Sequence, residues 1–244
     1  MIRRLFEKDI PFLKEKTSDK STTSVKIKAL ARAYGTQNDF VAFYSDENGD
    51  IIICIQDYSA TVRLNNAVSE EQLHELADFL QGNASEVMAD FEIPMPKSYN
   101  IQIGYSYSGM LEGKPCTDIN NNLKQCFDIL KVIFTEWITE EIFEQWYTDM
   151  SHRIRHRVSK LYNKGNSTVT VYAKENDVLM LSQIATLPSG RKKGKALELI
   201  QYAVSDNMPF EKIMLDSLNE KSDSFYEHIG FKVNNKWYYY LNKK

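Results

Sequence analysis

Residues 184–196, Ile-Ala-Thr-Leu-Pro-Ser-Gly-Arg-Lys-Lys-Gly-Lys-Ala, join a hydrophobic segment to an amphipathic one. The pattern predicts a strand that ends near Thr186 and a helix that begins near Gly194. The first turn of a helix carries N–H groups without backbone partners and a partial positive charge, which together favour bound phosphate. Four of the five residues from Arg191 to Lys195 are basic. The segment therefore predicts a site for a ligand with several phosphate groups.

Two glycines of this segment, Gly190 and Gly194, are expected to let the backbone approach an anion closely, because neither has a Cβ. The segment is not a Walker A loop, since Gly190-Arg-Lys-Lys-Gly194-Lys-Ala is one residue short and lacks the Ser or Thr that binds Mg²⁺. It has no Gly-x-Gly pair, so it is not a dinucleotide fingerprint either. A solvated basic loop at the start of a helix is the alternative interpretation.

Two motifs resemble those of a known superfamily. Arg191-Lys-Lys-Gly194-Lys-Ala196 is similar to the Arg/Gln-x-x-Gly-x-Gly/Ala pattern of the GCN5-related N-acetyltransferases, the GNAT superfamily. Asn219, followed by Ser224-Phe-Tyr226-Glu-His-Ile-Gly230-Phe231, resembles the second landmark of that superfamily. Two motifs in the right order are more specific than either one alone. The resemblance covers residues 130–244 well.

The resemblance implies an α+β fold in three layers, with a mixed, mostly antiparallel sheet flanked by helices. The sheet is expected to splay between the strand that ends at Thr186 and a strand over residues 212–218. We expect two domains, residues 1–118 and 119–244. The first shares with the second an order of helices, hairpin, helix and strand but has no phosphate loop, which permits a degenerate copy of the same fold.

The resemblance also implies a function, the transfer of an acetyl group from acetyl-CoA to a primary amine. The backbone that would pair with the pantetheine arm belongs to Ile184, Ala185 and Thr186. The residues that would hold the pyrophosphate are Arg191, Lys192, Lys193, Gly194, Lys195 and Ala196. Asn219 would contact the pantetheine or the acceptor, and Tyr226 would protonate the leaving CoA thiolate. A phenol with a pKa near 10 still carries its proton at neutral pH.

The general base has no assignment from the sequence. Many GNAT enzymes place a Glu near the centre of the fold, whereas the matching strand here offers only Ser182 and Gln183. His152, His156 and Glu144 are weaker candidates. A domain that binds CoA without catalysis, acting as a regulatory or interaction module, is therefore the alternative function.

The segment Ser151-His-Arg-Ile-Arg-His156 places two histidines four residues apart on one face of an expected helix. Such a pair can bind a metal, but there is no accompanying Glu and the nearby arginines disfavour a cation. We expect no metal. The segment is instead expected to shape the acceptor pocket, with Arg153 and Arg155 contacting the acceptor.

Composition limits the classes of partner. With 30 basic and 33 acidic residues the net charge is −3, which argues against a dedicated nucleic-acid binder. No segment approaches the roughly 18–20 apolar residues of a membrane span, and the N-terminus does not resemble a secretory signal. Three cysteines in no metal-binding spacing favour reduced thiols in the cytoplasm. A small-molecule or peptide amine is the expected partner, and a homodimer is left open.

Further elements follow from local patterns. Asn48-Gly49 predicts a tight hairpin turn, and Ser69 with Gln72 predicts a capping box at the start of a helix that ends at Gly82. Apolar residues at helical spacing predict one long helix over residues 136–161. The remaining expected elements are strands over 85–88, 99–107, 167–173, 177–186 and 236–241, and helices over 24–34, 194–206 and 221–229.

Overall fold

The structure, a computed structural model, describes residues 1–218 and 220–243, with residues 220 and 221 described by their backbone alone. The chain forms two compact units. The N-terminal unit contains Met1–Tyr107, Asp216–Tyr226 and Lys232–Lys244, and the C-terminal unit contains Ser108–Leu215 and Glu227–Phe231. The C-terminal strand thus belongs to the N-terminal unit. A single boundary at residue 118 would assign this strand to the C-terminal domain.

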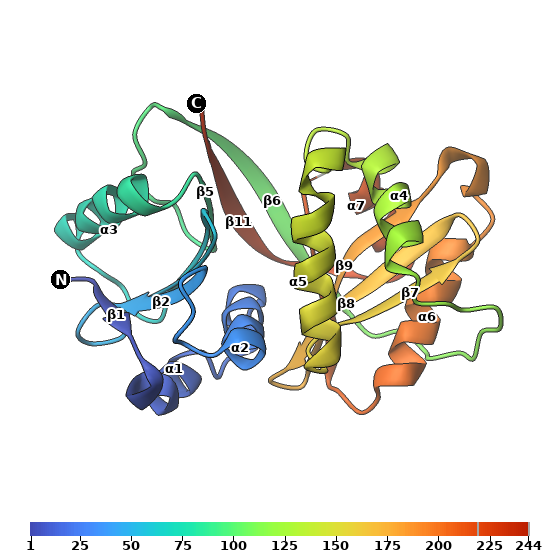
Figure 1. Ribbon diagram of the computed structural model, residues 1–244, viewed down its shortest axis with the longest axis horizontal. Coiled ribbons are helices and arrows are strands. Elements are labelled where there is room, and N and C mark those ends of the chain that lie inside the picture. Colours follow the sequence, from blue (N-terminus) through green and yellow to red (C-terminus); the bar gives the residue numbers. More distant parts are fainter. Residues whose placement is uncertain (219, 244) are drawn as a thin grey trace. The chain divides into compact units, whose positions relative to one another are not determined.

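The N-terminal unit begins with strand β1 and two helices, followed by an antiparallel meander (Figure 1). Its elements are β1 (Arg3–Leu5), α1 (Ile10–Lys16), α2 (Thr22–Tyr34), β2 (Val41–Ser45), β3 (Ile51–Gln56), β4 (Ser59–Leu64), α3 (Glu70–Asn83), β5 (Glu86–Ala89), β6 (Tyr99–Gly109) and β11 (Lys232–Asn242). Helix α3 connects β4 to β5, and these two strands are parallel. Strand β11 pairs with β5 in the antiparallel sense, which gives the strand order β1-β2-β3-β4-β5-β11-β6.

Both faces of the N-terminal sheet are covered. Side chains of α1 and α2 pack with Ile52 and Cys54 of β3, whereas α3 packs with Ile51, Ile53 and Ile55 of the same strand. Successive side chains of a strand point to opposite faces, so the two helical layers lie on opposite sides of the sheet. This explains why β3 is an uninterrupted apolar run rather than an alternating one.

The C-terminal unit repeats the same order of elements. Its elements are α4 (Leu123–Ile133), α5 (Phe143–Arg155), β7 (Lys160–Lys164), β8 (Ser167–Glu175), β9 (Val178–Thr186), α6 (Lys195–Asn207) and β10 (Lys212–Ser217), followed along the chain by α7 (Glu220–His228). Strands β7, β8 and β9 form an antiparallel meander. Helix α6 then leads to β10, which is parallel to β9. Each unit therefore has two helices, three antiparallel strands, a helix and a parallel strand, and the expected α+β architecture is confirmed.

Helices also cover both faces of the C-terminal sheet. Leu161 of β7 packs with residues of α4 and α5, among them Leu130 and Met150. The next residue, Tyr162, contacts Tyr202 of α6 with the ring centroids 5.3 Å apart. Neighbouring residues of a strand face opposite ways. Helices α4 and α5 thus cover one face, and α6 covers the other.

The prediction of one long helix over residues 136–161 is wrong. A short 3-10 turn over residues 140–142 precedes α5, which ends at Arg155, and Arg157 has a positive φ of 58° that a helix cannot continue through. Leu161 then lies in strand β7. Its apolar side chain fits both a helical and a strand pattern, so periodicity alone did not locate the break. Strand β4 and helix α4 were not anticipated.

Replacing Gly104 by alanine is expected to destabilise the N-terminal unit by about 1–3 kcal/mol, since overpacking a tight contact costs that much. A Cβ at this position in β6 would lie 2.4 Å from the Trp237 ring of β11 and 2.8 Å from the carbonyl oxygen of Ser217. Urea unfolding followed by circular dichroism measures the loss. Gly82→Ala is the matched control, because a Cβ there meets nothing within 4 Å and alanine is favoured in a helix. Equal stability of the two variants would contradict the prediction.

Candidate functional site

Strand β9 separates from β10 partway along its length. The parallel ladder between them runs from Val178 to Met180 on β9 and from Lys212 to Met214 on β10. Strand β9 continues six residues further, to Thr186, while still paired with β8. The edge of residues 181–186 that faces away from β8 is therefore not paired with β10, and the backbone there can accept an extended ligand as an added strand. The expected splay is confirmed.

A β-bulge lies in this separated part of β9. Thr168 of β8 pairs with Ala185 and Thr170 pairs with Ser182, so two residues of β9 are opposite one residue of β8. Gln183, in the bulge, has a φ of 49°, and its side chain accepts a hydrogen bond of 3.0 Å from the Thr170 hydroxyl. A bulge turns the backbone groups of its strand and is frequent beside active sites. The amino-acid pattern of β9 carried no signal of this bulge.

The start of helix α6 has no side-chain cap. Its N-cap residue is Gly194, in the left-handed conformation with φ 71° and ψ 0°, which has no side chain to accept a hydrogen bond from the first helical N–H groups. The intrahelical ladder begins with the bond from the Glu198 N–H to the Gly194 carbonyl. The N–H groups of residues 195–197 are thus directed away from the helix. A Cβ at Gly194 would meet nothing within 4 Å, so the space beside these groups is open.

The basic residues before α6 are on the surface. Arg191, Lys192 and Lys193 are exposed. The Arg191 side chain donates to the Thr186 carbonyl at 3.2 Å, and Lys193 Nζ donates to the Ser189 carbonyl at 2.9 Å. Both partners are uncharged, so each side chain orders the loop and keeps its positive charge. The loop therefore presents three cations next to an uncapped helix start, where anions are favoured.

The equivalent helix of the N-terminal unit is closed by its own side chains. Ser69 Oγ accepts from the Gln72 N–H at 3.2 Å, and Gln72 Oε1 accepts from the Ser69 N–H at 2.8 Å. This is the capping box expected from the sequence. At α3 the side chain of the N-cap residue accepts from one helical N–H group, that of Gln72, whereas the N-cap residue of α6 is a glycine, and no basic loop precedes α3. The two units share a topology, but the glycine N-cap and the basic loop before it are found at α6 and not at α3.

The other glycine of the loop has a different role from the expected one. Gly190 is buried, and a Cβ on it would meet Asn166 Cβ at 3.0 Å and Thr186 Cγ2 at 3.2 Å. Its missing side chain permits close packing on the β7–β8 turn rather than approach to a ligand. The expectation for Gly190 is corrected accordingly, whereas Gly194 keeps its open surroundings.

One carboxylate lies in the first turn of α6. Glu198 is bound by Lys164 Nζ of β7 at 2.5 Å and by Lys195 Nζ at 3.1 Å. These hydrogen bonds, together with one from the Cys116 thiol, lower the pKa of Glu198 to about 2. The carboxylate is therefore charged at neutral pH, and two ammonium groups offset its charge at the helix start.

Tyr226, the expected proton donor, lies in the part of α7 that belongs to the N-terminal unit and is only 7% exposed. Its ring contacts Tyr107, with the ring centroids 5.6 Å apart. Burial, reinforced by the nearby Asp223, raises the pKa of this phenol above its usual value near 10, so the side chain keeps its proton throughout the neutral range. Asn219, the other expected residue of this motif, lies outside the described residues.

The residues of α5 divide into two groups. Arg153 is 5% exposed, donates to the Tyr172 carbonyl at 3.0 Å, and stacks over the Tyr172 ring at 4.0 Å. The expectation that it contacts an acceptor is wrong, because it is part of the core.

Arg155 is exposed and lines a pocket of about 540 Å³ with Tyr147 and Ser151. The rings of His152 and His156 stack on each other, 4.1 Å apart.

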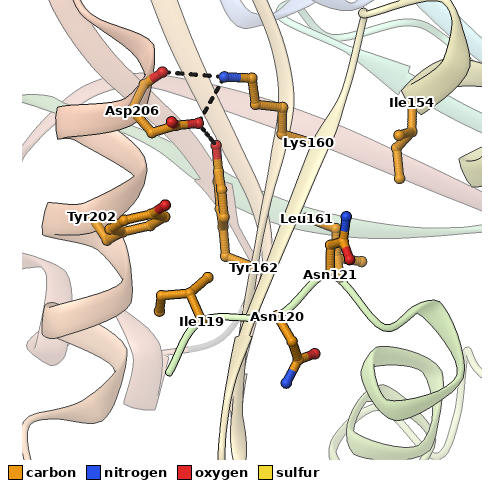
Figure 2. Close-up of a pocket in the computed structure, with 9 residues that line it drawn as sticks. All are labelled: Ile119, Asn120, Asn121, Ile154, Lys160, Leu161, Tyr162, Tyr202 and Asp206. Carbon is orange, nitrogen blue, oxygen red and sulfur yellow. Dashed lines mark hydrogen bonds and ion pairs between the residues drawn. The ribbon is translucent and has the colours of Figure 1, made fainter. Parts of the chain in front are cut away.

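A second pocket of about 380 Å³ lies at the outer edge of β7 (Figure 2). There Asp206 of α6 accepts from Lys160 Nζ and from the Tyr162 hydroxyl, both at 2.7 Å (Figure 2). Asn121 and Ile154 border this pocket and the pocket beside Arg155 alike. The two pockets are thus neighbours, one lined by residues of α5 and the other by residues of β7 and α6.

Within the described part of the chain, no group of three or more His, Cys, Asp or Glu side chains is placed to hold a metal ion. Over the same residues, none of the helices combines the length and the hydrophobicity needed to cross a membrane.

Comparison with known proteins gives matches in structure and not in sequence. No protein-family model matches the chain, and no curated protein is similar enough in sequence to match. A putative acetyltransferase from Pyrococcus horikoshii matches with a TM-score of 0.60 and 10% identity, over 100% of this chain and 89% of that one.

Two further solved structures match over nearly their full length. A GNAT-family acetyltransferase from Colwellia psychrerythraea has a TM-score of 0.58 and 12% identity, with all of both chains covered. A tandem GNAT protein of the clavulanic acid biosynthesis pathway has a TM-score of 0.56 and 9% identity, over 100% of this chain and 98% of that one. These similarities and the repeated order of elements lead to one conclusion: the chain has the fold of the GCN5-related N-acetyltransferases, with two GNAT-like units in tandem.

Proposed function

We propose that the chain is an N-acetyltransferase that transfers the acetyl group of acetyl-CoA to a primary amine, with the coenzyme bound by the C-terminal unit. One observation carries the proposal. The start of α6 has a glycine N-cap and is preceded by three exposed cationic side chains, and the strand before this loop, β9, is not paired with β10 over residues 181–186. The contrast with α3, whose start is closed by Ser69 and Gln72, argues that the open start is a ligand site and not a general property of the fold.

The proposed binding mode uses the two features together. The pyrophosphate of CoA accepts hydrogen bonds from the N–H groups of residues 195–197, with the charges of Arg191, Lys192 and Lys193 around it. The pantetheine arm extends along residues 184–186 of β9 and hydrogen-bonds to their backbone, as an added strand does. The bulge at Gln183 lies at the far end of this path, where the thioester would be.

The reaction then needs few groups from the protein. The amine nitrogen attacks the thioester carbonyl carbon, a C–N bond forms, the C–S bond breaks, and the amine loses a proton. Holding the two reactants together supplies much of the rate. Tyr226 is proposed to give its proton to the departing thiolate sulfur, and its raised pKa means that it carries that proton throughout the neutral range. The base that takes the amine proton is not assigned.

Two measurements test this function. Calorimetric titration of the full chain with acetyl-CoA is expected to show one binding site. Release of free CoA thiol, followed with a thiol reagent over a panel of polyamines, amino acids, aminoglycosides and peptides, is expected to show turnover with at least one class. Absence of binding would refute the proposal for the C-terminal unit.

A CoA-binding module without catalysis is the second candidate. It is favoured by the composition of β9, since residues 181–186, all of them described, include no carboxylate that could act as a base. Binding of acetyl-CoA without thiol release across the whole amine panel would select this alternative.

Gly194→Ala is expected to weaken acetyl-CoA binding about tenfold, because the new Cβ would occupy the space in which a phosphate would contact the helix N–H groups. Gly165→Ala is the matched control: Gly165, in the β7–β8 turn, also has a positive φ (55°) and open space where a Cβ would lie. Both variants are expected to lose about 1–2 kcal/mol of stability from the left-handed conformation. Calorimetry should separate them in affinity, and equal affinities would contradict the binding mode.

A further inference from the structure

The segment before α4 is held against helix α6. A Cβ at Gly113 would lie 2.9 Å from the backbone of Ser205, so the segment approaches the helix as closely as a glycine allows. The next residue, Lys114, donates its N–H to the Gln201 carbonyl at 3.1 Å. The segment thus runs along α6 towards the start of the helix. This path fixes the position of Cys116.

Cys116 lies between a cation and an anion. Its sulfur is 3.0 Å from Lys164 Nζ and 3.2 Å from the Glu198 carboxylate, to which the thiol donates. Glu198 and Lys164 also pair with each other at 2.5 Å. The thiolate is the form of cysteine that reacts with an oxidant. The nitrogen of Lys164 is placed to react with the sulfur once the sulfur is oxidised.

The other two cysteines differ from Cys116. Cys54 and Cys126 are buried. Burial raises the pKa of the Cys126 thiol to about 11, and it raises that of Cys54 further still. Buried thiols of this kind are inert. Cys116 is half-buried, so it is more exposed to solvent than the other two cysteines.

We propose that Cys116 and Lys164 form a peroxide-sensitive pair that closes into a reversible sulfur–nitrogen cross-link. The Cys116 thiol loses its proton to water, the thiolate attacks one oxygen of hydrogen peroxide, an S–O bond forms and the O–O bond breaks. The leaving hydroxide takes a proton from the Lys164 ammonium, which gives water, a sulfenic acid and a neutral amine. The amine then attacks the sulfur, an S–N bond forms, and a second water leaves. Sulfur is oxidised by two electrons, and the peroxide is reduced.

The cross-link has a consequence at the start of α6. The bridged nitrogen carries no positive charge, so Glu198 loses one of its two cationic partners. A less compensated carboxylate in the first turn disfavours a bound anion. If the proposed function is right, oxidation therefore weakens acetyl-CoA binding, by about three- to tenfold. This consequence rests on the proposed function, whereas the cross-link itself does not.

Mass spectrometry tests the cross-link. The reduced full chain is treated with a small excess of hydrogen peroxide, and the expected product has lost two hydrogen atoms (about 2 Da) and joins the peptides of Cys116 and Lys164. Dithiothreitol should restore the starting mass. Cys54 and Cys126 are expected to stay unmodified as internal controls. Oxidation of Cys126 before Cys116, or of Cys116 without a joined peptide, would overturn the proposal.

Variants distinguish the contribution of Cys116 from that of Lys164. Lys164→Met is expected to stop at the sulfenic acid, which dimedone labels, and Cys116→Ser should give neither product. Lys195→Met is the matched control, because Lys195 also binds Glu198 and should leave the cross-link unchanged. If the cross-link forms but acetyl-CoA affinity does not change, the pair stands and its link to the proposed function fails. Loss of the cross-link in Lys195→Met would show that the charge of the cluster, and not the Lys164–Cys116 contact, is responsible.

Discussion

Reversing two charges of the loop, in Lys192→Glu/Lys193→Glu, is expected to weaken acetyl-CoA binding about 30-fold, since four units of charge near the phosphates at an exposed site amount to about 2 kcal/mol. Both side chains are exposed, so the change should leave the stability of the chain nearly unaltered. Calorimetric titration at low and high salt measures the effect. The difference between the variant and the original chain should shrink at high salt, because salt screens exposed charges.

A matched variant distinguishes a local from a global charge effect. Lys8→Glu/Lys14→Glu changes the net charge by the same amount on two exposed lysines of the N-terminal unit. Its affinity for acetyl-CoA is expected to stay within about twofold of the original, because the Debye length at physiological salt is only about 8 Å. If both double variants lost the same affinity, the loop before α6 would not be the phosphate site.

The parts of the site that could be predicted from the sequence are those set by neighbouring residues. The change from strand to helix between Thr186 and Gly194 depends on local periodicity and on a glycine at the helix start, and the structure has both. The capping box of Ser69 and Gln72 is local in the same sense. A short pattern contains all the information that such features need.

The parts that could not be predicted depend on residues far apart in the chain. The bulge at Gln183 arises from the register of β8 against β9, and no residue type in β9 requires it. The pairing of β11 with β5 joins Tyr238 to Ala89, which a division of the chain into consecutive domains excludes. The helix end at Arg155 was missed because apolar spacing continued through it into β7.

The start of α6 can be interpreted only by comparison with the equivalent helix of the N-terminal unit. In the sequence, the basic loop before α6 was equally well explained as a solvated loop. The structure adds a second helix in the same topological position, α3, whose start is capped by Ser69 and Gln72. Two helices at the same place in the fold thus differ in whether the N-cap side chain accepts from a helical N–H group. This difference favours the interpretation as a ligand site, which the binding measurements test.

Tyr226→Phe is expected to lower kcat about 100-fold and to leave the affinity for acetyl-CoA within about twofold, since a positioned general acid contributes two to four orders of magnitude to the rate. The substitution removes one oxygen atom from a ring that is packed against Tyr107, so the ring contacts remain. Initial rates of thiol release at saturating acetyl-CoA and amine give kcat, and calorimetry gives the affinity.

Tyr240→Phe is the control for Tyr226→Phe, because it is expected to lower stability and to leave kcat unchanged. Tyr240 is also a buried tyrosine, and its hydroxyl accepts a hydrogen bond of 2.7 Å from the Ile93 N–H. Removing that hydroxyl leaves a buried donor without a partner and should cost about 1–3 kcal/mol of stability, with no effect on kcat. A general loss of folding would lower both variants alike, whereas loss of a proton donor lowers kcat in Tyr226→Phe alone.

The pH dependence provides a further test of Tyr226. A group whose pKa is raised above 10 by burial is protonated at all lower pH values, so it cannot cause a fall in kcat between pH 7 and its raised pKa. Ionisation of Tyr226 should therefore cause no loss of kcat on the alkaline side up to about pH 10, the ordinary value for a phenol. A fall in kcat centred near pH 8 that disappears in Tyr226→Phe would mean that the phenol ionises far too easily for its buried position, and the proton donor would have to be another group.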